Sequence, residues 1–144
     1  MQTGQKEKHG IFYITQSVAL LDDSGGFLAL RHRTGKWLLA GGHINVGEDW
    51  HSALLRELKE ETGLGDVELM GVFQVDSWTS PEGPQYGTYF LGRSHEDKIG
   101  LSEEHIEYRW LRNLQEVESL DWWVPELRER AIKAWKIFHD EKSL

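Results

Sequence analysis

The sequence predicts a domain of the α/β (or α+β) class, in which a β-sheet is combined with helices. Runs rich in β-branched and aromatic residues are separated by Gly, Pro and Asp clusters, which indicates several strands. Two amphipathic segments have helical spacing. The length of 144 residues fits one domain, expected over residues 1–144, with polar residues 1–9 as a flexible N-terminal tail.

The first elements are predicted to be strands. Ile11 to Leu21 is apolar and rich in strand formers, and Phe27 to Arg31 resumes the same pattern. The stretch between them, Asp22 to Gly26, is a strong turn signal, so the two runs predict a β-hairpin. Lys36 to Ala40 predicts a further short strand, which ends at a pair of glycines.

A helix is predicted after the loop from His43 to Glu48. Asp49 is a good N-cap residue for a helix over Trp50 to Glu61. Gly63 follows at the position where a left-handed residue ends a helix. Trp50, Leu54 and Leu58 recur every four residues, which predicts an apolar face that packs on the sheet.

The second half of the chain is predicted to contain more strands and a last helix. The stretch between two of these strands, Val75 to Gln85, contains Pro81 and Pro84 and is predicted to be an exposed loop. Pro125 suits the first turn of the final helix. The remaining predicted elements are strands at Asp66–Gln74, Tyr86–Leu91 and Ile106–Leu111, and a helix from Pro125 to about His139.

Three carboxylates are concentrated on one side of the first helix. Glu57, Glu60 and Glu61 occupy positions i, i+3 and i+4, where like charges repel. Lys59 points about 200° away from Glu57, so it does not relieve this repulsion. Oxygen ligands without Cys or His suit hard ions such as Mg²⁺ or Mn²⁺. From the helix alone, a solvated acidic face is the other interpretation.

Composition excludes several classes of protein. The chain has no Cys, which rules out disulfides, thiolate metal sites and a cysteine nucleophile and fits a reducing compartment, here expected to be the cytoplasm. No apolar run approaches the roughly 18 residues of a membrane-spanning helix, and the polar N-terminus does not resemble a signal peptide. The net charge of −8 argues against binding a nucleic acid polymer. A phosphate-containing substrate would therefore need a bound cation as mediator.

The segment from Gly42 to Leu64 changes the balance between these interpretations. It contains Gly, five residues, Glu, seven residues, Arg-Glu, an apolar residue, any residue, Glu-Glu, any residue, Gly and an apolar residue. This segment resembles the signature of the Nudix hydrolases at every specified position. Seven fixed residues at roughly 5–7% usage each give a chance match of about 10⁻⁹ per starting position. The family departs from this chain in the preceding loop, where many members have Pro at Ala40 and an acidic residue at Asn45.

The resemblance implies a fold, a reaction and a cofactor. The implied fold is an α/β/α sandwich with a mixed β-sheet flanked by helices. The implied reaction is Mg²⁺- or Mn²⁺-dependent hydrolysis of a phosphoanhydride bond in a nucleoside diphosphate linked to another moiety. The implied metal ligands are Glu57, Glu60 and Glu61 with the backbone of Gly41 and Gly42, where the missing side chains leave room for a close approach.

Further catalytic roles are expected around these ligands. Arg56 is expected to orient Glu48 or Glu57 through its fork of donors. The general base is either a glutamate of the motif, including Glu57 and Glu60, or a later one. Glu103, Glu104 and Glu107 are the later candidates, and Glu107 is favoured because it precedes Trp110 on a predicted strand. An ordinary exposed strand residue is the alternative interpretation of Glu107.

Substrate contacts are expected outside the signature, and each has a structural alternative. Arg31 and Arg33 could contact phosphates or belong to a charged edge strand. His43 could contact a phosphate or face solvent in its loop. Trp78 and Tyr86 could stack on a nucleobase or belong to the core.

Two substrate classes are considered, together with a third interpretation in which the protein binds a nucleotide without catalysis. A (deoxy)nucleoside triphosphate is favoured by the short chain, and ADP-ribose or another nucleotide sugar is the alternative. A catalytically silent nucleotide-binding domain is the alternative of another class, although such domains usually lose motif carboxylates and this chain keeps them all. The expected partner is a small nucleotide, with no membrane or nucleic acid polymer; assembly into a homodimer is left open.

Overall fold

A computed structural model describes residues 9–140 of the chain. The predicted tail, residues 1–9, falls outside this part except for His9. The strands are β1 (Tyr13–Asp22), β2 (Phe27–His32), β3 (Trp37–Leu38), β4 (Ala40–His43), β5 (Val67–Ser80), β6 (Gly83–Ser94) and β7 (His105–Leu111). The helices are α2 (Trp50–Thr62), α3 (Leu114–Ser119) and α4 (Pro125–His139).

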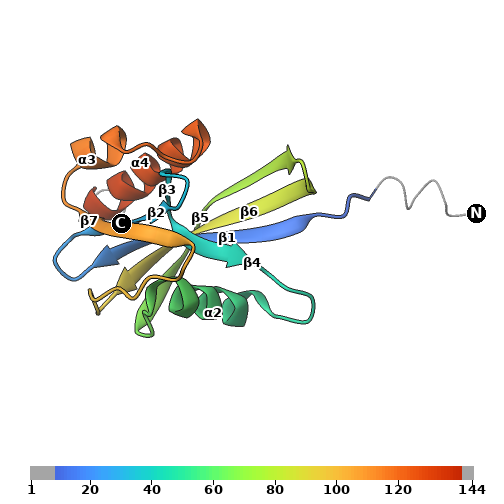
Figure 1. Ribbon diagram of the computed structural model, residues 1–144, viewed down its shortest axis with the longest axis horizontal. Coiled ribbons are helices and arrows are strands. Elements are labelled where there is room, and N and C mark those ends of the chain that lie inside the picture. Colours follow the sequence, from blue (N-terminus) through green and yellow to red (C-terminus); the bar gives the residue numbers. More distant parts are fainter. Residues whose placement is uncertain (1–8, 141–144) are drawn as a thin grey trace, which may run out of the picture.

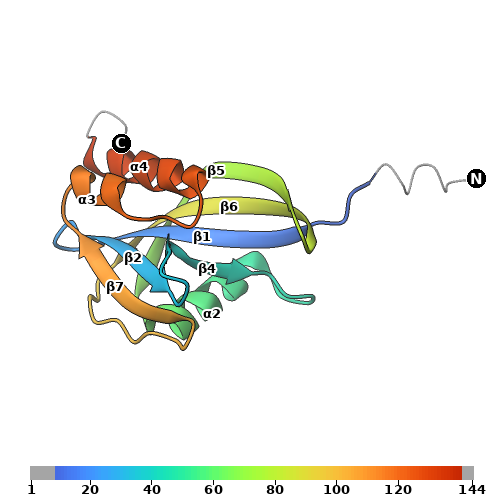
Figure 2. The same ribbon diagram turned by 45° about the horizontal axis from the view of Figure 1, so that its top comes forward.

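The seven strands form one mixed sheet. The order along its main path is β3-β2-β1-β6-β5, with β4 paired to β1 and β7 paired to β2. Only β1 and β6 are parallel, whereas the other pairs are antiparallel. Helix α2 covers one face, and α3 and α4 cover the other (Figures 1 and 2). The predicted α/β/α sandwich with a mixed sheet is therefore confirmed.

Strand β1 supplies the two cores from its alternating side chains. Ala19 and Leu21 pack with the α4 side, in a cluster that includes Phe27 and Trp135. Val18 and Leu20 point the other way and pack with Leu54 and Leu58 of α2. This alternation is the normal pleat of a strand that is buried on both faces. It places α2 over the face of β1 that Val18 and Leu20 line.

The ends of helix α2 agree with the prediction. The side chain of Asp49 accepts a hydrogen bond from the Ser52 amide at 2.9 Å, and Gly63 ends the helix with φ 74°. Leu54 and Leu58 are fully buried, as expected from their spacing. Trp50 differs, because it is half exposed and stacks on Phe90 with the ring centroids 5.3 Å apart.

Two predictions about the strands are corrected by the structure. Val75 to Gln85 is not a loop, because β5 and β6 continue through it as a long hairpin that turns at Pro81-Glu82. Pro84 is tolerated there since it is the second residue of β6, beside the hairpin turn and before the pairing of β6 with β1 begins at Gln85. The run Lys36–Ala40 is divided into β3 and β4, and the glycine pair lies inside β4.

Helix α3 was not predicted. Its N-cap, Asn113, accepts a hydrogen bond from the Glu116 amide at 2.9 Å, and Glu116 in turn accepts one from the Arg112 amide at 3.3 Å. An Asn followed three residues later by Glu is a recognisable N-terminal capping pattern. This pattern could have identified the helix, but its six residues are too few to show periodicity.

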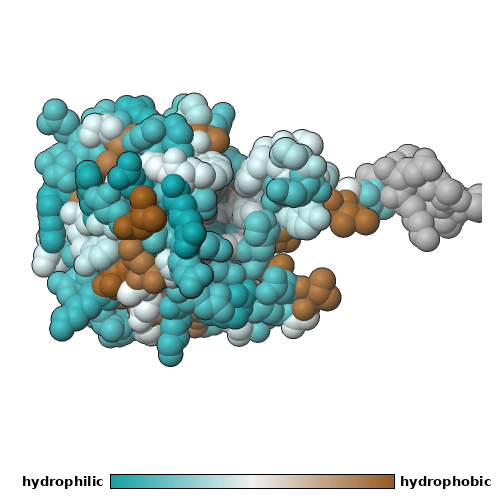
Figure 3. All heavy atoms as spheres, in the orientation of Figure 1, coloured by the Kyte–Doolittle hydropathy of each residue, from teal (hydrophilic) through white to brown (hydrophobic). Residues whose placement is uncertain are grey.

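The surface seen in Figure 3 is mainly hydrophilic, with small separate hydrophobic areas. Scattered exposed apolar side chains of this kind are normal. Within the described residues, no helix combines the length and the apolar character needed to cross a bilayer.

Helix α4 is tied to the β5–β6 hairpin by an ion pair. Arg130 donates two hydrogen bonds to Asp76, from Nε to Oδ2 at 2.8 Å and from Nη2 to Oδ1 at 3.0 Å. Both side chains are about four-fifths buried. The Arg130 guanidinium lowers the pKa of Asp76, so the paired carboxylate stabilises the fold above its unfolded pKa near 3.8.

We expect Asp76→Asn to lower Tm at pH 7 by a few degrees, corresponding to about 1.5–3 kcal/mol for a hydrogen bond to a charged group. The difference from wild type should persist at pH 4 and shrink only at lower pH, as the pH falls through the lowered pKa of Asp76 and protonation removes the same charge from the wild type. Thermal melts between about pH 2 and pH 8 test this. Asp121→Asn is the matched control, since Asp121 forms an exposed ion pair with Lys36 and should change Tm little. A Tm difference for Asp76→Asn that is independent of pH would contradict the expectation.

Candidate active site

Helix α2 places two of its carboxylates against the backbone of β4. The Gly41 amide donates a hydrogen bond to Glu61 Oε1 at 2.8 Å. A Cβ atom on Gly42 would overlap the carboxyl group of Glu57. A Cβ atom on Gly41 would overlap the backbone oxygen of Gln16 on β1. Only glycine therefore allows β4 to lie between β1 and these two glutamates.

Arg56 holds the other acidic residues of the motif. Its Nε and Nη2 donate to the two oxygens of Glu48 at 2.7 and 2.8 Å, a bidentate arrangement. Its Nη1 donates to Glu57 at 2.9 Å and to Glu60 at 3.2 Å. The guanidinium lowers the pKa of Glu48. Arg56 therefore fixes the loop before the helix to the acidic face of the helix.

Among the glutamates of the motif in the described residues, Glu61 is the one without a cationic partner. It is 9% exposed, and burial raises its pKa to about 8, partly offset by the hydrogen bond from Gly41. Burial also raises the pKa of Glu57, but there the Arg56 guanidinium opposes the shift. A buried carboxylate without a cation is costly, so Glu61 is suited to bind one.

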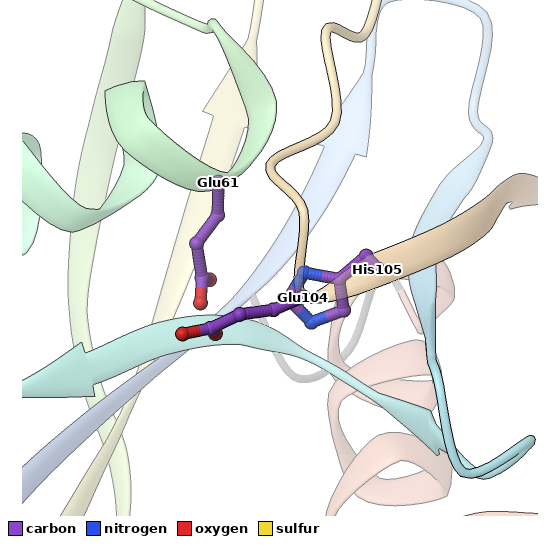
Figure 4. Close-up of side chains that lie close together, drawn as sticks. All are labelled: Glu61, Glu104 and His105. Atoms are coloured by element: carbon purple, nitrogen blue, oxygen red, sulfur yellow. The ribbon is translucent and has the colours of Figure 1, made fainter.

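Glu104, just before β7, and His105, the first residue of β7, meet Glu61. Ligand atoms of Glu61, Glu104 and His105 all lie within 4.8 Å of one another. Figure 4 shows Glu61 descending from α2 and Glu104 reaching toward it from the segment before β7, with both carboxylates above β4. Two carboxylates and the nearby Gly41 backbone provide the oxygen donors that a divalent cation prefers. The donor set therefore fits a metal ion.

The helix carboxylates are not arranged as the spacing suggested. In residues 9–140, the only group of three or more acidic or His ligand atoms that lie this close is the one at Glu61. Glu57 and Glu60 are turned toward Arg56, and the side chain of Glu60 is 58% exposed. The spacing argument considered Lys59 and overlooked Arg56, which stands at i, i+4 to Glu60 and supplies the balancing charge.

Glu107 lies elsewhere, in two ion pairs. It pairs with Arg31 at 3.2 Å across the β2–β7 ladder and with Arg109 at 3.0 Å. These guanidinium groups, Arg109 first, lower its pKa. Arg31 is thereby committed to Glu107 and lies over the Trp37 ring. Arg33 donates from Nε to the backbone oxygen of Glu103, so it holds the segment that carries Glu104.

The predicted substrate-binding aromatics lie on opposite faces of the sheet. Trp78 pairs with Gln85, whereas Tyr86 pairs with Ser77, so their side chains point to opposite sides. A Cβ atom on Gly87 would touch both the Trp78 ring and Thr15, which places Trp78 on the α4 face. His43, opposite Thr15, shares that face.

His43 and Trp78 therefore border one surface, and Tyr86 borders the other. His43 is exposed, and its ring contacts Tyr13 edge-on with the centroids 6.2 Å apart. Trp78 and Tyr86 are about two-fifths exposed, so neither belongs to the core. The sequence did not single out Tyr13 or His105. For Tyr13 the only available signal was an aromatic residue near the start of a predicted strand. For His105 it was the position directly after the candidate Glu104.

Comparison with known proteins identifies the family. Residues 13–133 match the NUDIX domain. The chain is 33% identical over 92 residues to the bis(5'-nucleosyl)-tetraphosphatase (asymmetrical) of Rattus norvegicus, a match that covers 59% of this chain and 63% of that protein. This match therefore spans less than two thirds of the rat protein.

Two further matches are longer. Nucleoside triphosphatase NudI of Escherichia coli O1:K1 is 28% identical over 107 residues, or 65% of this chain and 69% of that one. The crystal structure of a MutT protein from Methanosarcina mazei Go1 superposes with a TM-score of 0.74 at 24% identity, covering 92% of this chain and 99% of that one. Because the family match spans most of the chain and includes the site above, the chain belongs to the NUDIX domain family.

Proposed function

We propose that this protein is a pyrophosphohydrolase that cuts a phosphoanhydride bond of a nucleoside diphosphate linked to another moiety, with a (deoxy)nucleoside triphosphate as the favoured substrate. The observation that carries the proposal is the buried Glu61 carboxylate, held on the Gly41 amide beside Glu104. The similarity to a protein named nucleoside triphosphatase supports the favoured substrate class.

A divalent cation, Mg²⁺ or Mn²⁺, is the proposed cofactor. When bound, it supplies neutralisation of phosphate oxygens and a water of lowered pKa. Glu61 and Glu104 are the side chains that would hold it, with Glu57 and the Gly41–Gly42 backbone beside them. Glu60 is assigned to the outer edge of the site, because its side chain is exposed and paired with Arg56.

The residues around the cofactor have separate roles in this proposal. Arg56 positions Glu57 by its 2.9 Å hydrogen bond while Glu48 holds the guanidinium from the other side. Glu57 is the better candidate for general base, since burial raises its pKa while two guanidinium groups lower that of Glu107. We therefore move the proposed base from Glu107 to Glu57 and assign Glu107 to holding Arg31.

A screen of nucleotides with purified protein tests the proposed reaction. We expect hydrolysis of a nucleoside triphosphate with Mg²⁺ or Mn²⁺, none in excess EDTA, and a fall in kcat of about 10²-fold or more for Glu57→Gln as a lost general base. Glu129→Gln, an exposed change on α4, is the control and should keep the wild-type rate. ADP-ribose and a dinucleoside tetraphosphate belong in the same screen. Turnover that persists in EDTA, or cleavage of ADP-ribose alone, would refute the proposed cofactor or the favoured substrate respectively.

Glu61 gives a prediction for stability as well as for activity. In metal-free protein at neutral pH, we expect Glu61→Gln to raise Tm by a few degrees. To fold, the wild-type carboxylate must take up a proton or bury its charge, whereas the amide keeps its oxygen for Gly41 and is neutral in both states. Functional sites commonly contain a local conflict of this kind. Adding Mn²⁺ should then raise Tm of the wild type more than that of the variant. Melts in EDTA and in Mn²⁺ measure both effects, and a lower Tm of the variant in EDTA would show that the charge is compensated.

Base recognition is proposed for the surface that Trp78 shares with His43. Trp78→Ala should raise KM about fivefold or more, the size of one lost base–aromatic stack, with a smaller change in kcat. Tyr86→Ala is the matched control, because it removes an equally exposed aromatic from the opposite face. KM and Tm measured on both variants separate binding from folding. An increase in KM for Tyr86→Ala alone would place the base on the α2 side.

A further inference from the structure

His105 is a buried histidine with no role in the reaction proposed above. It is 6% exposed, and its Nδ1 is buried without a hydrogen-bond partner among the described residues. A buried polar atom left unpaired costs about 1–3 kcal/mol. Such an atom in a native protein therefore calls for a ligand, a water or an ion.

The imidazole of His105 also lies close to two carboxylates. One of its ring nitrogens, Nδ1 or Nε2, is within 4.8 Å of carboxylate oxygens of both Glu61 and Glu104. Figure 4 shows the ring beside the Glu104 side chain at the start of β7. Two acidic side chains and an imidazole that converge in this way form a mixed oxygen and nitrogen donor set.

The imidazole is held in place by aromatic neighbours. The His32 ring meets it edge-on, with the centroids 6.0 Å apart and an interplanar angle of 85°. Trp123 packs edge-on against His32 at 5.2 Å. In the backbone, His105 also donates to the Ser102 oxygen at 3.3 Å. The ring is therefore restricted before any ligand arrives, which lowers the entropic cost of binding one.

A nitrogen donor changes which cation fits best. Mg²⁺ is bound by oxygen ligands and keeps several of its waters. Imidazole is a ligand of first-row transition metals, and affinity for such a site rises from Mn²⁺ along the series. Among oxygen donors alone Mg²⁺ and Mn²⁺ would be hard to distinguish, so His105 would be the source of a preference.

We propose that His105 is a nitrogen ligand in a cation site formed with Glu61 and Glu104, and that this ligand makes the site selective for a transition-metal dication such as Mn²⁺ over Mg²⁺. The inference builds on the proposed function, because it concerns the cation of the same site. It adds a ligand and an order of metal preference, and these depend on His105 alone.

Pulsed electron paramagnetic resonance of the protein with Mn²⁺ as the only added metal tests the proposal without a substrate. The wild type should show coupling of the bound Mn²⁺ to a nitrogen nucleus, which should change when the protein is labelled with ¹⁵N-histidine. His105→Gln should abolish the coupling and weaken Mn²⁺ binding by about tenfold or more, at least the effect of losing a second-shell partner. Competition by Mg²⁺ should change much less.

His32→Gln is the matched control, since it removes the neighbouring imidazole and leaves His105 in place. It should keep the nitrogen coupling, and thermal melts of both variants check folding. If His105→Gln does not fold, the labelled wild type and His32→Gln still decide the question. Bound Mn²⁺ without nitrogen coupling in the wild type, or parallel losses of Mn²⁺ and Mg²⁺ affinity in His105→Gln, would overturn the inference and leave the proposed hydrolase intact. A wild type that binds neither Mn²⁺ nor Mg²⁺ would instead overturn the cofactor of the proposed function.

Discussion

The contact between Glu61 and the Gly41 amide is the constraint on which the site depends. It buries a carboxylate between a helix and a strand, where a charge is stable only with hydrogen bonds or a cation. To form it, α2 must lie close to β4, which requires Leu54 and Leu58 to be fully buried against the sheet. The same closeness leaves no room for a side chain on Gly42, because Glu57 occupies that space. The buried Glu61 carboxylate therefore constrains both elements, requiring apolar residues at Leu54 and Leu58 of α2 and a glycine at Gly42 of β4.

The remaining negative charges are balanced by a single guanidinium. Arg56 contacts Glu48, Glu57 and Glu60, so each carboxylate of the loop and the outer helix face has a cationic partner within the protein. The inner end, with Glu61 and Glu104, receives no such cation among the described residues. An external cation would therefore be attracted most strongly to the end of the site with Glu61 and Glu104. With a cation bound there, as proposed, an acidic chain would offer phosphate groups a favourable electrostatic environment.

The pleat of the sheet separates the two sides of the site. Strand β1 sends alternate side chains to the α2 and α4 cores, and β6 continues the same alternation beside it. Trp78 is paired with Gln85, the residue before Tyr86. Trp78 and Tyr86 are therefore neighbours across the hairpin but face in opposite directions. Aromatic residues on the two strands of a hairpin share a face only when one lies directly opposite the other or an even number of residues from that position.

The sequence by itself determined the elements whose signals are local. The cap at Asp49, the stop at Gly63, the apolar spacing of Leu54 and Leu58, and the signature from Gly42 to Leu64 each depend on neighbours within a few turns, and the fold class followed from them. Val75 to Gln85 was mistaken for a loop because hairpin pairing with a distant strand overrides the local turn signal of its prolines. Only the tertiary structure decided which groups meet. Register between β2 and β7 placed Glu107 against Arg31, and it brought Glu104 and His105 to Glu61 from more than 40 residues away in the chain. Contacts of that kind depend on the path of the backbone in space, which the spacing of residues along the chain does not encode.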